Sequence, residues 1–175
     1  GTPGISDPGE DLVRLAYEAG AEVTSLPGAC ACVTALTLSG LPTRRFCFEA
    51  FLPSEKKQRE GILEELKTET RTVILYEAPH RLARTLGELL ETLGDRRITL
   101  CRELTKKHET AFVTTLTGAL DYYRDQEPKG ECVIVMEGRS RAQMKLEEQR
   151  SWEEMDINQH MDLYLSQGMD QKEAM

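Results

Sequence analysis

The 175-residue sequence lacks several features that define common classes of protein. No apolar run approaches the roughly 18 residues that span a bilayer, and the first residues lack the basic-then-apolar pattern of a signal peptide. No two of the five cysteines have CxxC spacing, and neither their odd number nor their positions suit a metal site. We therefore predict free thiols in a reducing cytoplasm, with no bound metal and no membrane segment.

Familiar nucleotide-binding and hydrolase motifs are also missing. The sequence contains neither G-x-G-x-x-G nor the phosphate loop G-x-x-x-x-G-K-[ST], so a dinucleotide or nucleoside triphosphate site is not supported. No Ser-His-Asp arrangement stands out. The net charge of −8 argues against wide, non-specific binding to nucleic acid, so an RNA substrate would require locally clustered cations.

What the sequence does contain is an alternation of helical and strand patterns. Apolar residues make up 39% of the chain, which is enough for a packed core. Helices are predicted for residues 8–19 (capped by Ser6 or Asp7), 29–39, 54–68, 81–93 and 117–124, and strands for 21–26, 45–51, 72–76, 97–102, 111–116 and 130–137. The pattern predicts an α/β fold, with hairpins that make the sheet mixed.

The composition suggests three regions along the chain. A break at Leu41-Pro42-Thr43 separates residues 1–41 from an α/β domain at 42–140, and a charged linker and helical region occupies 141–175. Within the last region, residues 142–154 are predicted to form a solvated helix or linker. Residues 156–168 have the spacing of an amphipathic helix, and Asp170 is placed to cap another.

Four segments have residue types suited to ligand binding. Residues 1–9 (GTPGISDPG) and 27–31 (PGACA) are glycine-bearing turns that enter helices, which lets backbone N–H groups approach a ligand. Residues 76–81 (YEAPHR) follow a predicted strand, as do residues 101–109 (CRELTKKHE), the densest cationic loop in the chain. Turns at one edge of an open α/β sheet form the crevice where ligands usually bind. Each segment alone is also compatible with a structural turn or a solvated surface.

Together and in this order, the four segments resemble the ribosomal RNA cytidine 2′-O-methyltransferase family of the tetrapyrrole-methylase superfamily. The family's signature is close to SDAGTPGISDPG, PGPSA, SGLP, F-x-F-x-G-F-L-P, FYESPHR and RELTK, and the resemblance covers nearly the whole chain. Three positions depart from it: Cys30 and Ala78 replace common serines, and Ala50 replaces a common glycine.

The resemblance implies a two-domain methylase, a homodimer, with S-adenosylmethionine between an N-terminal and a C-terminal α/β domain. It also implies that the first domain is incomplete here and that the chain is truncated at both ends. Its substrate would be a cytidine ribose in 16S RNA of the small ribosomal subunit. The cofactor-binding residues that it implies are Thr2, Pro3, Gly4, Ile5, Cys30, Ala31, Tyr76 and Glu77, with Arg102 and Glu103.

Methyl transfer from an activated sulfonium requires mainly in-line alignment and some help with proton removal. We interpret Glu77 or His80 as the proton acceptor, and Arg81, Arg102, Lys106 and Lys107 as contacts to RNA phosphates. Two alternatives stay open at this point: a methylase of small tetrapyrroles with the same fold, and a non-catalytic binding or assembly module.

Overall fold

The computed structural model of the chain describes residues 2–126 and 128–154. Its contacts divide the chain into two compact units, Gly1–Gly138 and Arg139–Met175. The described part of the second unit is residues 139–154 and contains helix α6 (Arg141–Glu154), so the helical alternative predicted for residues 142–154 is confirmed. The helices predicted after residue 155 lie outside the described residues. Among the helices described, none is both long and apolar enough to cross a membrane.

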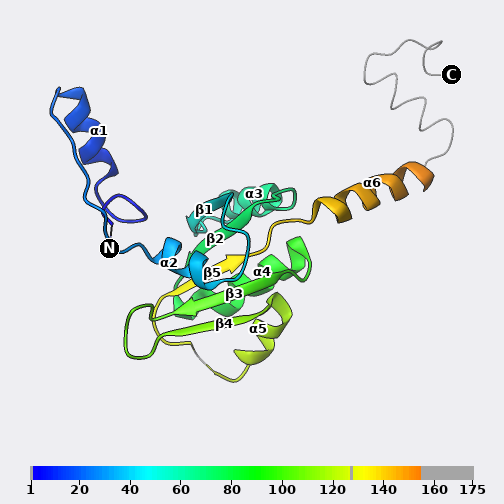
Figure 1. The fold of residues 1–175 in the computed structure, drawn as a ribbon. Coiled ribbons are helices and arrows are strands. Elements are labelled where there is room, and N and C mark those ends of the chain that lie inside the picture. The colour runs from blue at the N-terminus through cyan, green and yellow to red at the C-terminus, as the bar shows by residue number, and fades with distance from the viewer. Residues whose placement is uncertain (1, 127, 155–175) are drawn as a thin grey trace, which may run out of the picture. The chain divides into compact units, whose positions relative to one another are not determined.

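The first unit is built on a five-stranded sheet with the strand order β1-β2-β5-β3-β4 (Figure 1). The strands are β1 (Phe46–Phe51), β2 (Thr72–Glu77), β3 (Arg97–Arg102), β4 (Thr110–Thr115) and β5 (Cys132–Met136). Strands β1 and β2 are parallel, whereas β5 is antiparallel to both β2 and β3, and β4 is antiparallel to β3. The predicted mixed sheet is therefore confirmed.

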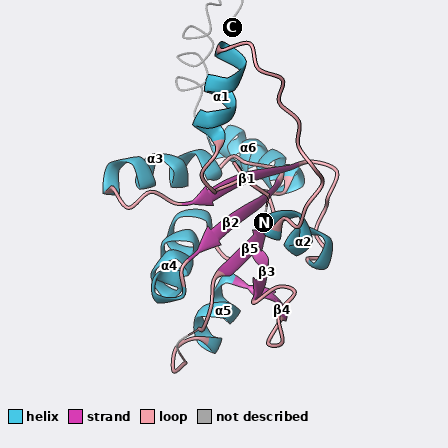
Figure 2. Ribbon diagram, turned by 90° about the vertical axis from the view of Figure 1, so that its left-hand side faces the viewer, coloured by secondary structure: helices cyan, strands magenta, loops and turns pink. Residues whose placement is uncertain are grey.

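Helices pack on both faces of this sheet (Figure 2). The helices of the unit are α1 (Glu10–Glu18), α2 (Ala31–Leu38), α3 (Lys56–Leu66), α4 (Leu82–Leu93) and α5 (Leu116–Tyr122), with a short 3₁₀ helix at Pro79–Arg81. One face is covered by α3, α4 and α5, and the other by α2. The predicted domain boundary after residue 41 stays a prediction.

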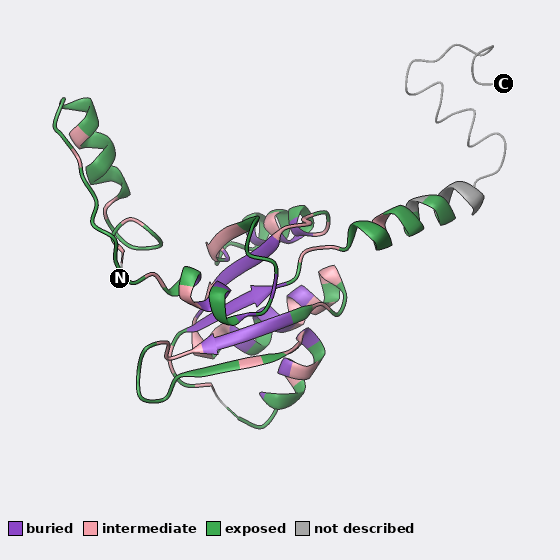
Figure 3. Ribbon diagram, in the orientation of Figure 1, coloured by how far each residue is buried: buried purple, intermediate pink, exposed green. Residues whose placement is uncertain are grey.

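Strand periodicity explains the two cores. Val73 and Leu75 of β2 pack among the leucines of α3 and α4, whereas Ile74 between them packs with Ala35 and Leu36 of α2. All five residues of β5 are buried, as expected for a strand inside a sheet that is covered on both faces. Figure 3 shows this buried centre, in contrast to α1, which has no buried residue.

Two predictions for the N-terminal segment are wrong. Residues 21–26 form no strand; they pair with no strand of the described sheet, and Leu26 is 83% exposed. A strand needs a partner for its backbone groups, and apolar alternation alone does not supply one. Helix α1 begins at Glu10, and neither Ser6 nor Asp7 caps it: Gly9 holds the cap position without a side-chain hydrogen bond.

A β-bulge interrupts β1 where the sequence departs from the pattern of the family that it resembles. The register with β2 shifts between Phe48 and Ala50, and Ala50 has a φ of 51°. This left-handed conformation favours glycine, which is the residue common in the family pattern at this position. The departure at Ala50 therefore places a side chain on a backbone shape that suits glycine.

Candidate functional site

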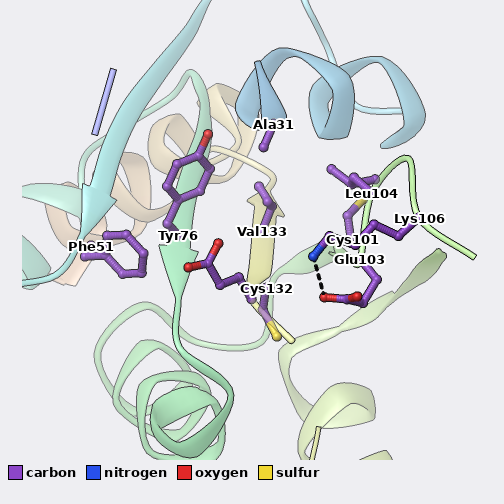
Figure 4. Close-up of a pocket in the computed structure, with 10 residues that line it drawn as sticks. Ala31, Phe51, Tyr76, Cys101, Glu103, Leu104, Lys106, Cys132 and Val133 are labelled. Atoms are coloured by element: carbon purple, nitrogen blue, oxygen red, sulfur yellow. Dashed lines mark hydrogen bonds and ion pairs between the residues drawn. The ribbon is translucent and has the colours of Figure 1, made fainter. Parts of the chain in front are cut away.

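The carboxyl ends of three strands meet at one edge of the sheet. Strands β1, β2 and β3 run in the same direction, because β5 lies antiparallel to both β2 and β3. A hollow of about 190 Å³ opens at this edge (Figure 4). It is lined by Ala31, Phe51, Tyr76, Cys101, Glu103, Leu104, Lys106, Glu131, Cys132 and Val133. This edge is where ligands bind in open α/β sheets. We call it the edge hollow.

Tyr76 forms an aromatic wall of the edge hollow. Its ring makes edge-to-face contacts with Phe48 at 4.9 Å and Phe51 at 5.6 Å between centroids. Its hydroxyl accepts a hydrogen bond of 2.9 Å from the backbone N–H of Cys32, in the first turn of α2. Burial, together with the neighbouring Cys32 thiol, raises the pKa of Tyr76 to about 12. The phenol therefore keeps its proton near neutral pH and fixes α2 against β2.

The turn before α2 joins the N-terminal loop to this wall. The Thr2 hydroxyl donates a hydrogen bond of 3.2 Å to the carbonyl of Ala29, one residue before Cys30. The sulfur atoms of Cys30 and Cys32 lie 3.3 Å apart, and neither residue is among those that line the hollow. The Thr2 loop, the Cys30 turn and Tyr76 are thus linked by hydrogen bonds, although Thr2 does not itself line the hollow. Among the described residues, the predicted cofactor contacts Pro3, Gly4 and Ile5 also lie outside its lining.

The loop after β3 closes another side of the hollow and is strained. Glu103 and Thr105 have φ values of 50° and 64°, which are uncommon for residues with side chains. The Glu103 carboxylate pairs with the Lys106 ammonium at 3.1 Å. A β-carbon at Gly130 would lie 2.0 Å from the Glu103 carboxylate, so a glycine there leaves room for this side chain. Strain of this kind often occurs at ligand sites.

Glu77 points away from the edge hollow. It follows Tyr76 on β2 and therefore faces the opposite side of the sheet, where it is fully buried. Its carboxylate accepts hydrogen bonds from the backbone N–H of Ala78 at 2.8 Å and from the Thr85 hydroxyl at 2.5 Å. The Arg81 guanidinium lies 3.2 Å from the same carboxylate. These contacts hold the turn between β2 and α4.

The remaining predicted residues are divided between the structure's interior and its surface. Arg81 donates a hydrogen bond of 2.9 Å to the carbonyl of Leu52, so its guanidinium is used within the fold. His80 and Lys107 are exposed, and neither is among the residues that line the edge hollow. Arg102 lines a second hollow on the other face of the sheet rather than the first.

Sequence reasoning missed several residues of the lining. Phe51 ends β1 within the F-x-F motif, so its position at a strand's carboxyl end was a usable signal. Glu131 lies just before β5, and Cys132 and Val133 begin it. Only the insertion of β5 between β2 and β3 brings these residues to the hollow. That strand order cannot be read from the periodicity of any single segment.

The thiols at the hollow behave as apolar groups. Burial raises the pKa of Cys101 to about 11 and that of Cys132 to about 12. Both therefore remain protonated near neutral pH, when a thiol is a poor nucleophile and a poor metal ligand. Over the described part of the chain, no three His, Cys, Asp or Glu side chains gather as a metal site.

Comparison with known proteins identifies relatives of this chain. The sequence profile described as Tetrapyrrole (Corrin/Porphyrin) Methylases matches residues 1–120. Two relatives are named ribosomal RNA small subunit methyltransferase I. The protein from Halalkalibacterium halodurans is 46% identical to this chain, and the one from Synechocystis sp. is 43% identical. Each alignment covers 99% of this chain and 60% or 61% of the relative. The chain thus spans about 60% of the length of these relatives.

Solved structures show the same fold at lower identity. The methyltransferase CobJ has a TM-score of 0.59 and 22% identity, over 79% of this chain and 62% of its own. Uroporphyrin-III C-methyl transferase from Thermus thermophilus, in complex with S-adenyl homocysteine, has a TM-score of 0.50 and 18% identity, over 77% and 62%. The superfamily predicted from the sequence is confirmed. The chain belongs to the tetrapyrrole (corrin/porphyrin) methylase family.

Proposed function

We propose that the full-length protein carrying this chain methylates the ribose 2′-hydroxyl of a cytidine in small-subunit ribosomal RNA, using S-adenosylmethionine. The observation that supports this most is the edge hollow, where the Cys30 turn, Tyr76 and the loop after β3 converge. Relatives 46% and 43% identical bear the name of a small-subunit ribosomal RNA methyltransferase, which favours RNA over a tetrapyrrole as substrate.

The lining of the edge hollow fits part of S-adenosylmethionine. Phe51 and Tyr76 offer aromatic surfaces that suit both an adenine ring and a sulfonium cation. Glu103 and Glu131 offer carboxylates for the hydroxyl and ammonium groups of the cofactor. The volume of about 190 Å³ is below the roughly 300–1,000 Å³ of pockets for drug-sized ligands. We therefore assign the hollow to one portion of the cofactor.

When bound, S-adenosylmethionine supplies an activated methyl group, so the protein's main task is alignment. Tyr76 orients the first turn of α2 through its hydrogen bond with Cys32 and presents its ring to the hollow. The apolar lining formed by Leu104, Val133 and the protonated thiol of Cys101 excludes water from that surface.

We propose different roles for the two predicted proton acceptors. Glu77 is fully buried and both its oxygen atoms are engaged, so we propose that it positions the turn leading to Arg81. His80 is exposed on the 3₁₀ helix of the same turn, so its side chain is accessible to a bound RNA. We retain His80 as the proposed proton acceptor.

Lys106 and Lys107 are the proposed phosphate contacts at the rim of the hollow. Both are exposed in the loop after β3, and Lys106 lines the hollow while paired with Glu103. For Arg81 we propose a structural role in place of a phosphate contact, because its guanidinium already contacts Glu77 and the Leu52 carbonyl. A homodimeric state and a cytoplasmic location also belong to this proposal, since they follow from the family resemblance alone.

Single-turnover methylation tests the proposal directly. The full-length protein is incubated with methyl-labelled S-adenosylmethionine and either unmodified small ribosomal subunits or uroporphyrinogen. Label in a cytidine ribose of the RNA is the expected result. Label in the tetrapyrrole would support the small-molecule alternative, and label in neither substrate would support a non-catalytic module. His80→Ala is expected to slow the RNA reaction by about a hundredfold.

A further inference from the structure

A second hollow lies on the sheet face that α5 covers. Its volume is about 500 Å³, and among the described residues that line it are Arg102, His108, Tyr122, Tyr123, Gln126 and Lys129. Arg102 follows the core residue Leu100 by two positions on β3, so its side chain points to this face. Glu103 lines both this hollow and the edge hollow, which makes the two neighbours at the carboxyl end of β3.

The floor of the second hollow is aromatic. The ring of Tyr122 lies 4.9 Å from that of Phe112 on β4 and 4.9 Å from that of Tyr123. Tyr122 is nevertheless 48% exposed, so part of its ring is available to a ligand. Three packed rings, of which Tyr122 is partly exposed, make a platform of the kind on which unpaired bases stack.

Cations border this platform. The Arg102 guanidinium lies over the Tyr123 ring, 5.8 Å from its centroid, and donates a hydrogen bond of 3.3 Å to the Lys129 carbonyl. The Nε atom of Arg102 is buried and has no hydrogen-bond partner among the described residues. The side chains of His108 and Lys129 are exposed. Glu103 lies nearby, but its charge is balanced by the Lys106 ammonium.

We propose that the second hollow binds one unpaired nucleotide of the RNA substrate, with its base stacked on Tyr122 and its phosphate near Arg102 and Lys129. This inference rests on the proposed RNA methyltransferase function and adds a second contact to it. The volume of about 500 Å³ is sufficient for a single nucleotide. Because Glu103 separates the two hollows, the bound nucleotide is one that flanks the methylated cytidine.

Base stacking on the platform would also allow RNA binding despite the negative net charge of the chain. A net charge of −8 disfavours binding that depends on phosphates alone. Stacking on an aromatic ring does not require a basic surface, so a few local cations suffice to orient the strand. The combination of Tyr122 with Arg102 and Lys129 supplies both contributions within one hollow.

The test uses the full-length protein and two variants at Tyr122. Affinity for unmodified small ribosomal subunits is measured from the RNA dependence of single-turnover methylation, and affinity for S-adenosylhomocysteine by titration calorimetry. Tyr122→Ala is expected to raise the half-saturating RNA concentration by about tenfold, with cofactor affinity within twofold of wild type. Tyr122→Phe, which keeps the ring, is expected to restore the affinity for RNA.

Val113→Ala is the matched control, because Val113 is 52% exposed on β4 and lines neither hollow. It is expected to leave both affinities unchanged. Ultraviolet crosslinking of the wild-type protein to RNA, followed by peptide mapping, covers the case in which Tyr122→Ala fails to fold. Crosslinks at Tyr122 are expected.

An unchanged RNA affinity in Tyr122→Ala, or crosslinks that map only elsewhere, would overturn the inference while leaving the proposed function intact. Failure of the proposed function looks different, because the wild-type protein itself would then methylate no RNA.

Discussion

The backbone amide of Cys32 donates a hydrogen bond of 2.9 Å to the hydroxyl of Tyr76, across 44 positions of sequence. This bond fastens the first turn of α2 to the carboxyl end of β2, where the edge hollow opens. The Thr2 hydroxyl is fastened to the same turn through the Ala29 carbonyl. Two glycine-bearing segments and a strand end are therefore held in one place, as binding of a single ligand requires.

Loss of the Tyr76 hydroxyl should loosen this arrangement. Tyr76→Phe keeps the ring contacts with Phe48 and Phe51 but leaves the Cys32 amide without its acceptor. The expected result is a two- to tenfold weaker affinity for S-adenosylhomocysteine, about the effect of one hydrogen bond, measured by calorimetry on the full-length protein. Tyr17→Phe, at a 63% exposed position of α1, is the control. Equal affinities for both variants would show that the hydrogen bond does not position the site.

Replacing the buried carboxyl group of Glu77 by an amide should lower the free energy of unfolding more than the same replacement at an exposed glutamate. The side chain is fully buried and its carboxylate contacts Thr85 and Arg81, so Glu77→Gln is expected to lower the free energy of unfolding by about 1–3 kcal/mol. Urea denaturation gives this value. Glu64→Gln, whose side chain is 69% exposed beside Lys67, should change it by less than about 0.5 kcal/mol. A hundredfold fall in kcat with stability intact would instead identify Glu77 as the proton acceptor.

Ala50 and Gly94 both have a positive φ, but only one of them is a glycine. Exchanging alanine and glycine at the two positions should therefore change the free energy of unfolding in opposite directions. Ala50 has a φ of 51° at the bulge of β1, and Gly94 has a φ of 74° at the end of α4. Ala50→Gly is expected to raise the free energy of unfolding by about 0.5–1 kcal/mol, and Gly94→Ala to lower it by about 1 kcal/mol. Urea midpoints at constant m-value measure both. A destabilised Ala50→Gly would mean that the alanine side chain contributes more packing than its backbone conformation costs.

The ion pair between Glu69 and Arg71 predicts a pH-dependent stability. Hydrogen bonds from the Arg71 guanidinium hold the pKa of Glu69 at about 2, well below its usual 4.5. A depressed pKa in the folded state means that the stabilisation is present above pH 4.5 and is lost as the pH falls through about 2. Glu69→Gln should therefore be less stable than wild type at pH 6 and equal to it near pH 2, by thermal denaturation. A constant difference across this range would contradict the assignment, and Glu60→Gln, 62% exposed, is the control.

Periodicity predicted most of this fold because the buried strands and helices obey it. The pattern of β2 is an example: Val73 and Leu75 face one core and Ile74 the other. The failed strand at residues 21–26 shows the limit, since a strand also needs a hydrogen-bonded neighbour, which local sequence does not reveal.

The candidate site was predicted in part for the same reason. Ala31, Tyr76, Glu103 and Lys106 reach the edge hollow because turns and strand ends meet there. Glu77 does not, although strand alternation already required it to face away from Tyr76. Glu131 and Val133 depended on the position of β5 in the sheet, which is set by long-range pairing.

The most direct test of the account is whether the edge hollow binds the methyl donor. Ala31 and Val33 are both exposed on α2, but only Ala31 lines the hollow, so a tryptophan at position 31 would fill it and one at position 33 would not. In calorimetric titrations of the full-length protein, S-adenosylhomocysteine should bind the wild-type protein and Val33→Trp with similar affinity and bind Ala31→Trp at least tenfold more weakly. Undiminished binding by Ala31→Trp would place the cofactor elsewhere and contradict the account.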